Sequence, residues 1–60
     1  MTADERAQLV EDIRQSTSMR QLIVERASDD KDFDIAAAWE NLEELDASIN
    51  QRVIKARLKE

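Results

Sequence analysis

The 60-residue chain is acidic, with a net charge of −5, and it contains no Gly, Pro, Cys or His. A composition rich in charged residues and free of helix breakers is typical of long helices, and the lack of Cys excludes a disulfide framework. Because His is the commonest metal ligand and general base, we expect no metal, no cofactor and no enzymatic activity.

Targeting segments are not expected either. No apolar run follows a basic segment near the first residue, so a signal peptide is not predicted. The longest apolar runs fall far short of the about 20 residues that a membrane span needs. We therefore expect a soluble, cytoplasmic protein without membrane contact, in which residues 1–60 form a single helical-hairpin domain.

Apolar periodicity predicts a first helix over residues 3–27. Thr2 followed by Glu5 fits a capping box, in which the Thr hydroxyl accepts a hydrogen bond from the backbone N–H three residues on. The apolar residues on the inward line of this helix are Leu9, Ile13, Ile23 and Ala27. Ser16 and Arg20 fall on the same line, so polar side chains interrupt the predicted core near the middle of the helix. We call this segment the polar waist.

Two interpretations of the polar waist remain open. The run Ser-Thr-Ser at residues 16–18 has only moderate helix propensity, and Ser18 with Gln21 would suit a second capping box. We favour one continuous helix, because nothing in the run forbids helical backbone angles. Arg20 would then reach outward along its aliphatic stem or pair with Glu40.

The pattern fails over residues 28–32, which predicts a tight connection before a second helix at residues 32–59. Asp30, Asp32 and Asp34 compete as its N-terminal cap, and Phe33 with Ala38 would form a weak hydrophobic staple. This second helix has the cleaner inward stripe. Its members are Ile35, Ala38, Trp39, Leu42, Leu45, Ile49, Val53 and Ala56.

Charge predicts that the two helices are antiparallel. Residues 29–46 carry a net charge of −7 and residues 47–60 one of +3. Folding back near residue 30 places Asp12 and its acidic neighbours beside Arg52 and the other bases of the second helix. Each exposed pair is worth only about 0 to 1 kcal/mol, so charge selects the direction more than it supplies stability.

The sequence holds more apolar surface than one hairpin can bury. Leu22 and Met19 point away from the first core line, while Ala47, Ile54 and Leu58 form a second stripe on the other helix. Soluble monomers avoid such patches. We therefore predict an all-α homodimer, in which two hairpins close into a four-helix bundle. The residues expected in its core or dimer interface are Leu9, Ile13, Met19, Leu22, Ile23, Ile35, Trp39, Leu42, Leu45, Ile49, Val53, Ile54 and Leu58.

Acidic residues near the start of the second helix are the first candidate site. Asp30, Asp32 and Asp34 imitate the start of a calcium loop, but the required Gly is Ile35 and the required Glu is Asn41. Glu40, Glu43, Glu44 and Asp46 have no His partner for a carboxylate metal site and are expected mostly on the solvent side. The predicted protein-binding surface comprises Asp34, Glu40, Glu43 and Glu44.

A second candidate site is a set of cations near the other end. Arg52, Lys55 and Lys59 share one face of the predicted helix and could contact phosphates of a nucleic acid. The helix dipole, however, also favours cations at a helix C-terminus. With a net charge of −5 and no interleaved aromatics, nucleic-acid binding has weak support.

The layout resembles the Rop type of plasmid regulator, a small acidic protein whose two helices form a dimeric bundle. That resemblance implies RNA binding, because the family binds paired RNA loops through polar, basic and aromatic residues of its first helices. Here the first helix has no aromatic residue. The likeness is therefore one of shape. The cations on this helix are Arg6, Arg14, Arg20 and Arg26.

These observations favour a non-enzymatic helical dimer that binds another protein as a regulator, inhibitor or adaptor. Chains this short without chemistry of their own are often phage or plasmid products, so we expect such an origin from size alone. Two alternatives remain open. One is an RNA-binding bundle of Rop-like layout, and the other is an antitoxin-like subunit that folds fully only on its toxin.

Overall fold

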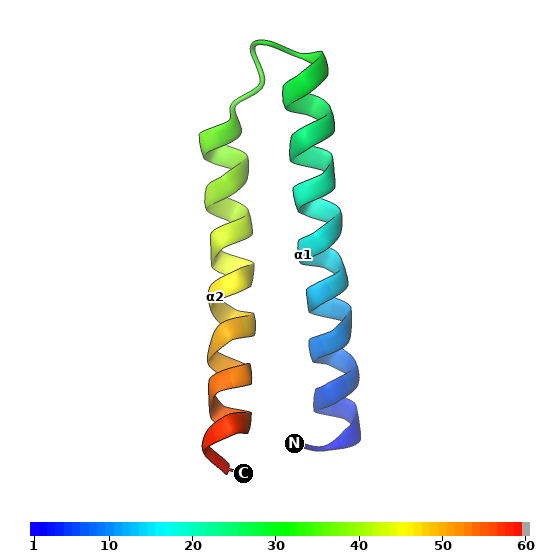
Figure 1. Cartoon of the computed structure of the whole chain (residues 1–60), viewed down its shortest axis with the longest axis vertical. Coiled ribbons are helices and arrows are strands. Elements are labelled where there is room, and N and C mark those ends of the chain that lie inside the picture. The colour runs from blue at the N-terminus through cyan, green and yellow to red at the C-terminus, as the bar shows by residue number, and fades with distance from the viewer. Residues whose placement is uncertain (60) are drawn as a thin grey trace.

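A computed structural model describes residues 1–59, except for the side chain of Lys59, and consists of two α-helices (Figure 1). α1 spans Ala3–Asp29 and α2 spans Ile35–Lys59. The helices lie side by side and antiparallel, with the start of α1 and the last turn of α2 at one end of the molecule and the connection at the other. The predicted all-α hairpin is confirmed. Neither helix, over the described residues, has a stretch long and apolar enough to cross a membrane.

α1 begins where its capping residues predict. The backbone N–H of Glu5 donates to the Thr2 hydroxyl at 3.2 Å, so Thr2 is the cap. The helix continues through residues 16–18, where the Thr17 hydroxyl donates to the Ile13 carbonyl at 3.1 Å instead of starting a new turn. The continuous interpretation is confirmed, and α1 ends two residues beyond its predicted end, at Asp29.

The start of α2 was predicted three residues too early. Asp30 cannot cap α2 because its carboxylate accepts from the backbone N–H of Asp32 at 2.9 Å and closes a turn. Asp34 is the cap instead, since its carboxylate accepts from the N–H of Ala37 at 3.0 Å. The connection therefore comprises residues 30–34 and lies later in the chain than predicted, and α2 begins at Ile35.

The core between the helices is one side chain deep. Among the described residues, four large apolar side chains are buried, and Leu42 alone has no exposed surface. Nine others are exposed, including Ile35 and Trp39 from the predicted stripe. Two helices can shield each other only along one line, so residues on the flanks of each stripe stay open to solvent. The buried four are Leu9, Ile23, Leu42 and Ile49.

The accessible surface of the hairpin is large for its mass. It amounts to 5095 Å² for a 6.9 kDa chain, whereas a compact monomer of that mass exposes about 4,000 Å². The Cα atoms extend over 45 × 16 × 12 Å, a flat and elongated shape that accounts for the excess.

Candidate functional site

A polar cluster lies at the centre of the hairpin, where the sequence predicts the polar waist. Ser16 is 4% exposed, and its hydroxyl donates to a carboxylate oxygen of Asp46 at 2.5 Å. The other carboxylate oxygen of Asp46 pairs with the Arg20 guanidinium. No buried side-chain nitrogen or oxygen of the described residues lacks a hydrogen-bond partner, and these polar contacts tie α1 to α2 at one level.

The structure corrects two expectations about this cluster. The alternative in which Arg20 pairs with Glu40 is wrong, because Arg20 pairs with Asp46. Asp46 is half-buried, although the four acids were expected mostly on the solvent side. The spacing in the sequence contains the signal for the second point. Asp46 follows Leu42 by four residues and precedes Ile49 by three, so it shares their side of α2.

A second polar contact joins the helices nearer the chain ends. The Arg52 guanidinium lies 2.6 Å from a carboxylate oxygen of Asp12, as the charge pattern predicts. Gln8 donates to the other oxygen of that carboxylate at 3.0 Å. The hydrogen bonds from Arg52 and then Gln8 hold the pKa of the Asp12 carboxyl below its ordinary value. Arg52 also donates to the carbonyl of Ser48 at 3.2 Å, which orients its side chain toward α1.

This pair predicts how stability depends on pH. A carboxyl whose pKa is lower in the folded chain stabilises the fold above its unfolded pKa, and the contribution disappears as pH falls through the folded pKa. We expect Asp12→Asn to lower the melting temperature at pH 7, with the difference from wild type shrinking below about pH 4. Thermal melts monitored by circular dichroism between pH 2 and 7 measure this difference in melting temperature. Asp32→Asn, at an exposed residue of the connection, is the matched control. An Asp12→Asn difference that stays constant down to pH 2 would contradict the assignment.

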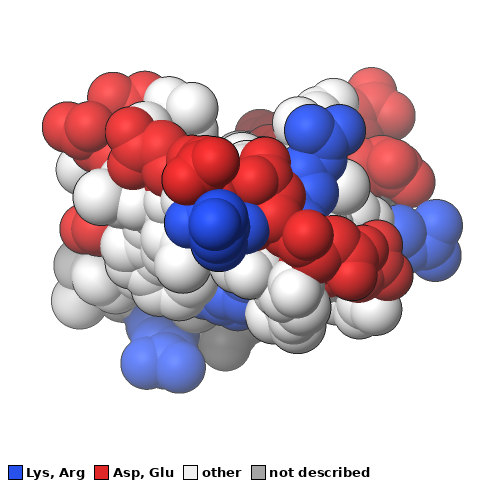
Figure 2. Space-filling view, turned by 90° about the horizontal axis from the view of Figure 1, so that it is seen from above, with Lys and Arg blue, Asp and Glu red and all other residues white. Residues whose placement is uncertain are grey.

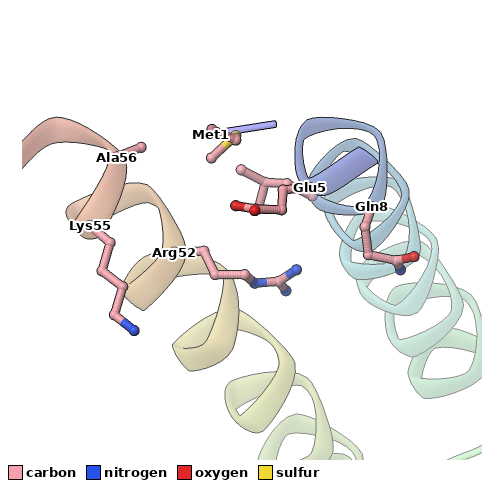
Figure 3. A pocket seen from close by; sticks show the side chains of 7 residues that line it. Met1, Glu5, Gln8, Arg52, Lys55 and Ala56 are labelled. Atoms are coloured by element: carbon pink, nitrogen blue, oxygen red, sulfur yellow. The ribbon is translucent and has the colours of Figure 1, made fainter. Parts of the chain in front are cut away.

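A small pocket opens beside this contact, between the start of α1 and the last turns of α2 (Figure 3). Its volume is about 200 Å³, which is below the about 300–1,000 Å³ of typical ligand sites. Glu5 and Arg52 point into the gap from opposite helices, whereas Lys55 extends along α2 away from α1. The pocket is lined by Met1, Glu5, Gln8, Leu9, Arg52, Lys55 and Ala56.

The three candidate phosphate contacts are not equivalent. Arg52 is half-buried and pairs with Asp12, so its charge is largely satisfied within the chain. Lys55 is exposed. The side chain of Lys59 lies outside the described part of the structure. The described side chains, those of Arg52 and Lys55, therefore do not form one exposed basic face.

The acidic candidates are exposed, but they do not act alike. Asp34 uses its carboxylate to cap α2, which gives that residue a local role. Glu40, Glu43 and Glu44 lie on the exposed side of the first half of α2. Figure 2 looks onto the connecting end and shows acidic side chains gathered over it around a small basic patch. No group of three or more acidic residues in the described chain is placed to hold a metal ion.

The outward face of α2, opposite α1, completes the set of surfaces. Its residues alternate at spacings of four and three, which is the repeat of a coiled-coil seam. All of them are exposed, and apart from Gln51 the face is apolar from Ala47 onward. The outward face comprises Glu40, Glu44, Ala47, Gln51, Ile54 and Leu58.

The surfaces that α1 and α2 cannot cover for each other are thus the outward sides of both helices and the two broad sides of the hairpin. Of the residues predicted for the core or dimer interface, Met19, Leu45 and Val53 are half-buried. Six are exposed: Ile13, Leu22, Ile35, Trp39, Ile54 and Leu58. No model of a known protein family, no curated protein and no solved structure matches the chain.

Proposed function

We propose that the chain is a non-enzymatic homodimer that acts as a regulator, inhibitor or adaptor by binding a helix of another protein. The observation that carries this proposal is the apolar half of the outward face of α2. Ile54 is 52% exposed and Leu58 is 82% exposed, on the side opposite α1. Their own hairpin cannot cover them, so a partner that packs along α2 is the occupant that would.

Surface area supports the dimer. The hairpin exposes about 1,100 Å² more than a compact monomer of its mass. A standard protein interface buries about 800 Å² on each partner, so the excess is enough for one such interface. The chain also has no disulfide to compensate for its thin core. Association is the source of stability left to it.

The residues of the outward face indicate what kind of partner would fit it. Its heptad spacing suits an amphipathic helix, whose residues would pack against Ala47, Ile54 and Leu58. The other half of the face carries Glu40 and Glu44, which attract cations. We therefore expect the bound helix to be apolar over one half and to carry Lys or Arg over the other.

Site-specific photo-crosslinking tests this proposal in the source cell. A photoreactive residue at position 58 should crosslink to one helix of a partner, identified by mass spectrometry, and a synthetic peptide of that helix should bind the purified protein. Leu58→Glu should weaken that binding by about 100-fold or more, because it places a charge in an apolar contact. Leu22→Glu, on α1, should leave the binding unchanged.

Other outcomes would overturn the proposal. If Ile54→Asp converts a dimer into monomers, the outward face of α2 is the dimer seam rather than a partner site. If the crosslinked molecule is RNA, with affinity falling steeply as salt is added and lost in Lys55→Glu, the partner class is wrong.

A further inference from the structure

One broad side of the hairpin carries exposed apolar residues on both helices. On α1, Ile13, Arg20 and Val24 are separated by seven and four residues and point the same way. Ile13 and Val24 are exposed. A groove between the helices is bordered by Ile13, Arg20 and Asp46, so this line of α1 shares its side with Asp46 of α2.

α2 continues the same side with a residue every seven positions. Trp39, Asp46 and Val53 follow each other at that spacing, and Trp39 is exposed while Val53 is half-buried. From Ile13 to Val24 and from Trp39 to Val53 this side is therefore apolar at both ends and polar in the middle, where Arg20 meets Asp46. Arg6 and Arg57 continue the two lines beyond Ile13 and Val53. We call this side the Asp46 face, and it comprises Ile13, Arg20, Val24, Trp39, Asp46 and Val53.

The Asp46 face is symmetric about its centre. Asp46 lies seven residues from Trp39 and seven from Val53, while the midpoint of Ile13 and Val24 falls between residues 18 and 19, next to Arg20. Because Arg20 contacts Asp46, the two helices share this centre. A two-fold dimer needs a patch whose halves complement each other after rotation. This arrangement meets that requirement, and a patch built for an unrelated partner has no need of it.

We infer that the Asp46 face packs against the same face of a second copy turned end for end. Ile13 then meets the partner's Val24, and Trp39 meets the partner's Val53. This inference rests on the dimer of the proposed function and specifies its seam. The broad side measures about 45 × 16 Å between Cα atoms, a projected area of about 700 Å², close to the about 800 Å² per partner of a standard interface.

Charge chooses this orientation over the alternative. A copy that is not turned would bring the two connections together, and residues 29–46 carry a net charge of −7. Turning the copy end for end brings that segment beside residues 47–60 of its partner, which carry +3. In the other orientation, in which the copy is not turned, Ile13 would pair with the partner's Val53. The two orientations therefore differ in a contact that can be measured.

The polar centre would set the register of the two copies. In the end-for-end orientation the Asp46 carboxylates of the two copies meet at the centre, but each is paired with Arg20 of its own chain, so association buries no unpaired charge. A sliding of one copy along the other would place apolar side chains against these groups. Single polar layers in helical bundles fix alignment in the same way.

Cysteine crosslinking tests the seam, because the chain has no native Cys. We expect a mixture of the Ile13→Cys and Val24→Cys proteins to form the mixed disulfide far faster than either protein links to itself. A mixture of Ile13→Cys and Val53→Cys should not crosslink efficiently. The reverse result, with Ile13 linking to Val53, would overturn the end-for-end orientation.

Matched substitutions on α1 test which side is used. Ile13 and Leu22 are 45% and 48% exposed, but only Ile13 lies on the Asp46 face. Ile13→Asp should raise the dimer dissociation constant by about 100-fold or more, whereas Leu22→Asp should change it by less than about threefold. Sedimentation and the emission of Trp39, which shifts to the blue when the ring is buried, measure the constant.

The failures of the two proposals can be told apart. A protein that stays monomeric at all concentrations overturns both the seam and the proposed dimer. A dimer that Leu22→Asp disrupts and Ile13→Asp does not overturns the seam alone, while helix binding at Leu58 would still be measured independently.

Discussion

Leu42→Ala should lower the free energy of unfolding by about 2–5 kcal/mol, the largest effect that we expect from one substitution. Leu42 is the one described large side chain without exposed surface, and it lies where α1 and α2 meet. Removing it leaves a cavity in a core that has only four buried apolar side chains. A domain of this length has about 3–9 kcal/mol of stability in all. The loss would therefore remove a large share of the stability of the chain.

Leu58→Ala is the matched control for this prediction. It makes the same chemical change in the same helix, but Leu58 is almost fully exposed. Its effect on the isolated protein should stay within about 0.5 kcal/mol. Urea denaturation of both variants at one protein concentration gives the comparison. If Leu42→Ala is as stable as Leu58→Ala, the two helices do not pack along the described line.

Asp46→Ala should cost about 1–3 kcal/mol, because it removes the acceptor of a buried hydroxyl. Ser16 would keep a donor without a partner, and Arg20 would lose its counter-charge. The loss exceeds what an exposed ion pair supplies, since the Ser16 side of the cluster is excluded from water. Denaturation at a fixed protein concentration measures the difference, because the stability of a dimer would vary with concentration.

A double-mutant cycle separates the hydrogen bond from the general effect of losing an acid. Ser16→Ala combined with Asp46→Ala leaves no orphaned hydroxyl, so we expect the double variant to be more stable than the sum of the single losses predicts. Glu43→Ala, at an exposed acid of the same helix, should change stability by less than about 0.5 kcal/mol. Strict additivity in the cycle would mean that Ser16 and Asp46 do not interact.

The register error in the sequence prediction has one cause. A fold-back near residue 30 pairs Arg20 with Glu40, whereas the observed contacts Asp12 with Arg52 and Ser16 with Asp46 centre on about residue 32. Three acids compete for the cap of α2, and only the turn closed by Asp30 shows that Asp34 provides it. Moving the fold-back point by two residues shifts every cross-helix partner by about four, which is one helical turn.

Local patterns in the chain were enough for much of the fold. Thr2 and Glu5 mark the start of α1, and the periodic apolar residues predict both helices. The uneven charge predicts that the helices are antiparallel. These features could be predicted because they depend on neighbouring residues in the sequence or on the net charge of a segment. The contacts between α1 and α2 could be identified only from the three-dimensional arrangement of the two helices. Whether Asp46 faces water or Ser16, and which apolar residues share one broad side, depends on the rotation and register of two packed helices, and those are set by the length of the connection and the fit of the core.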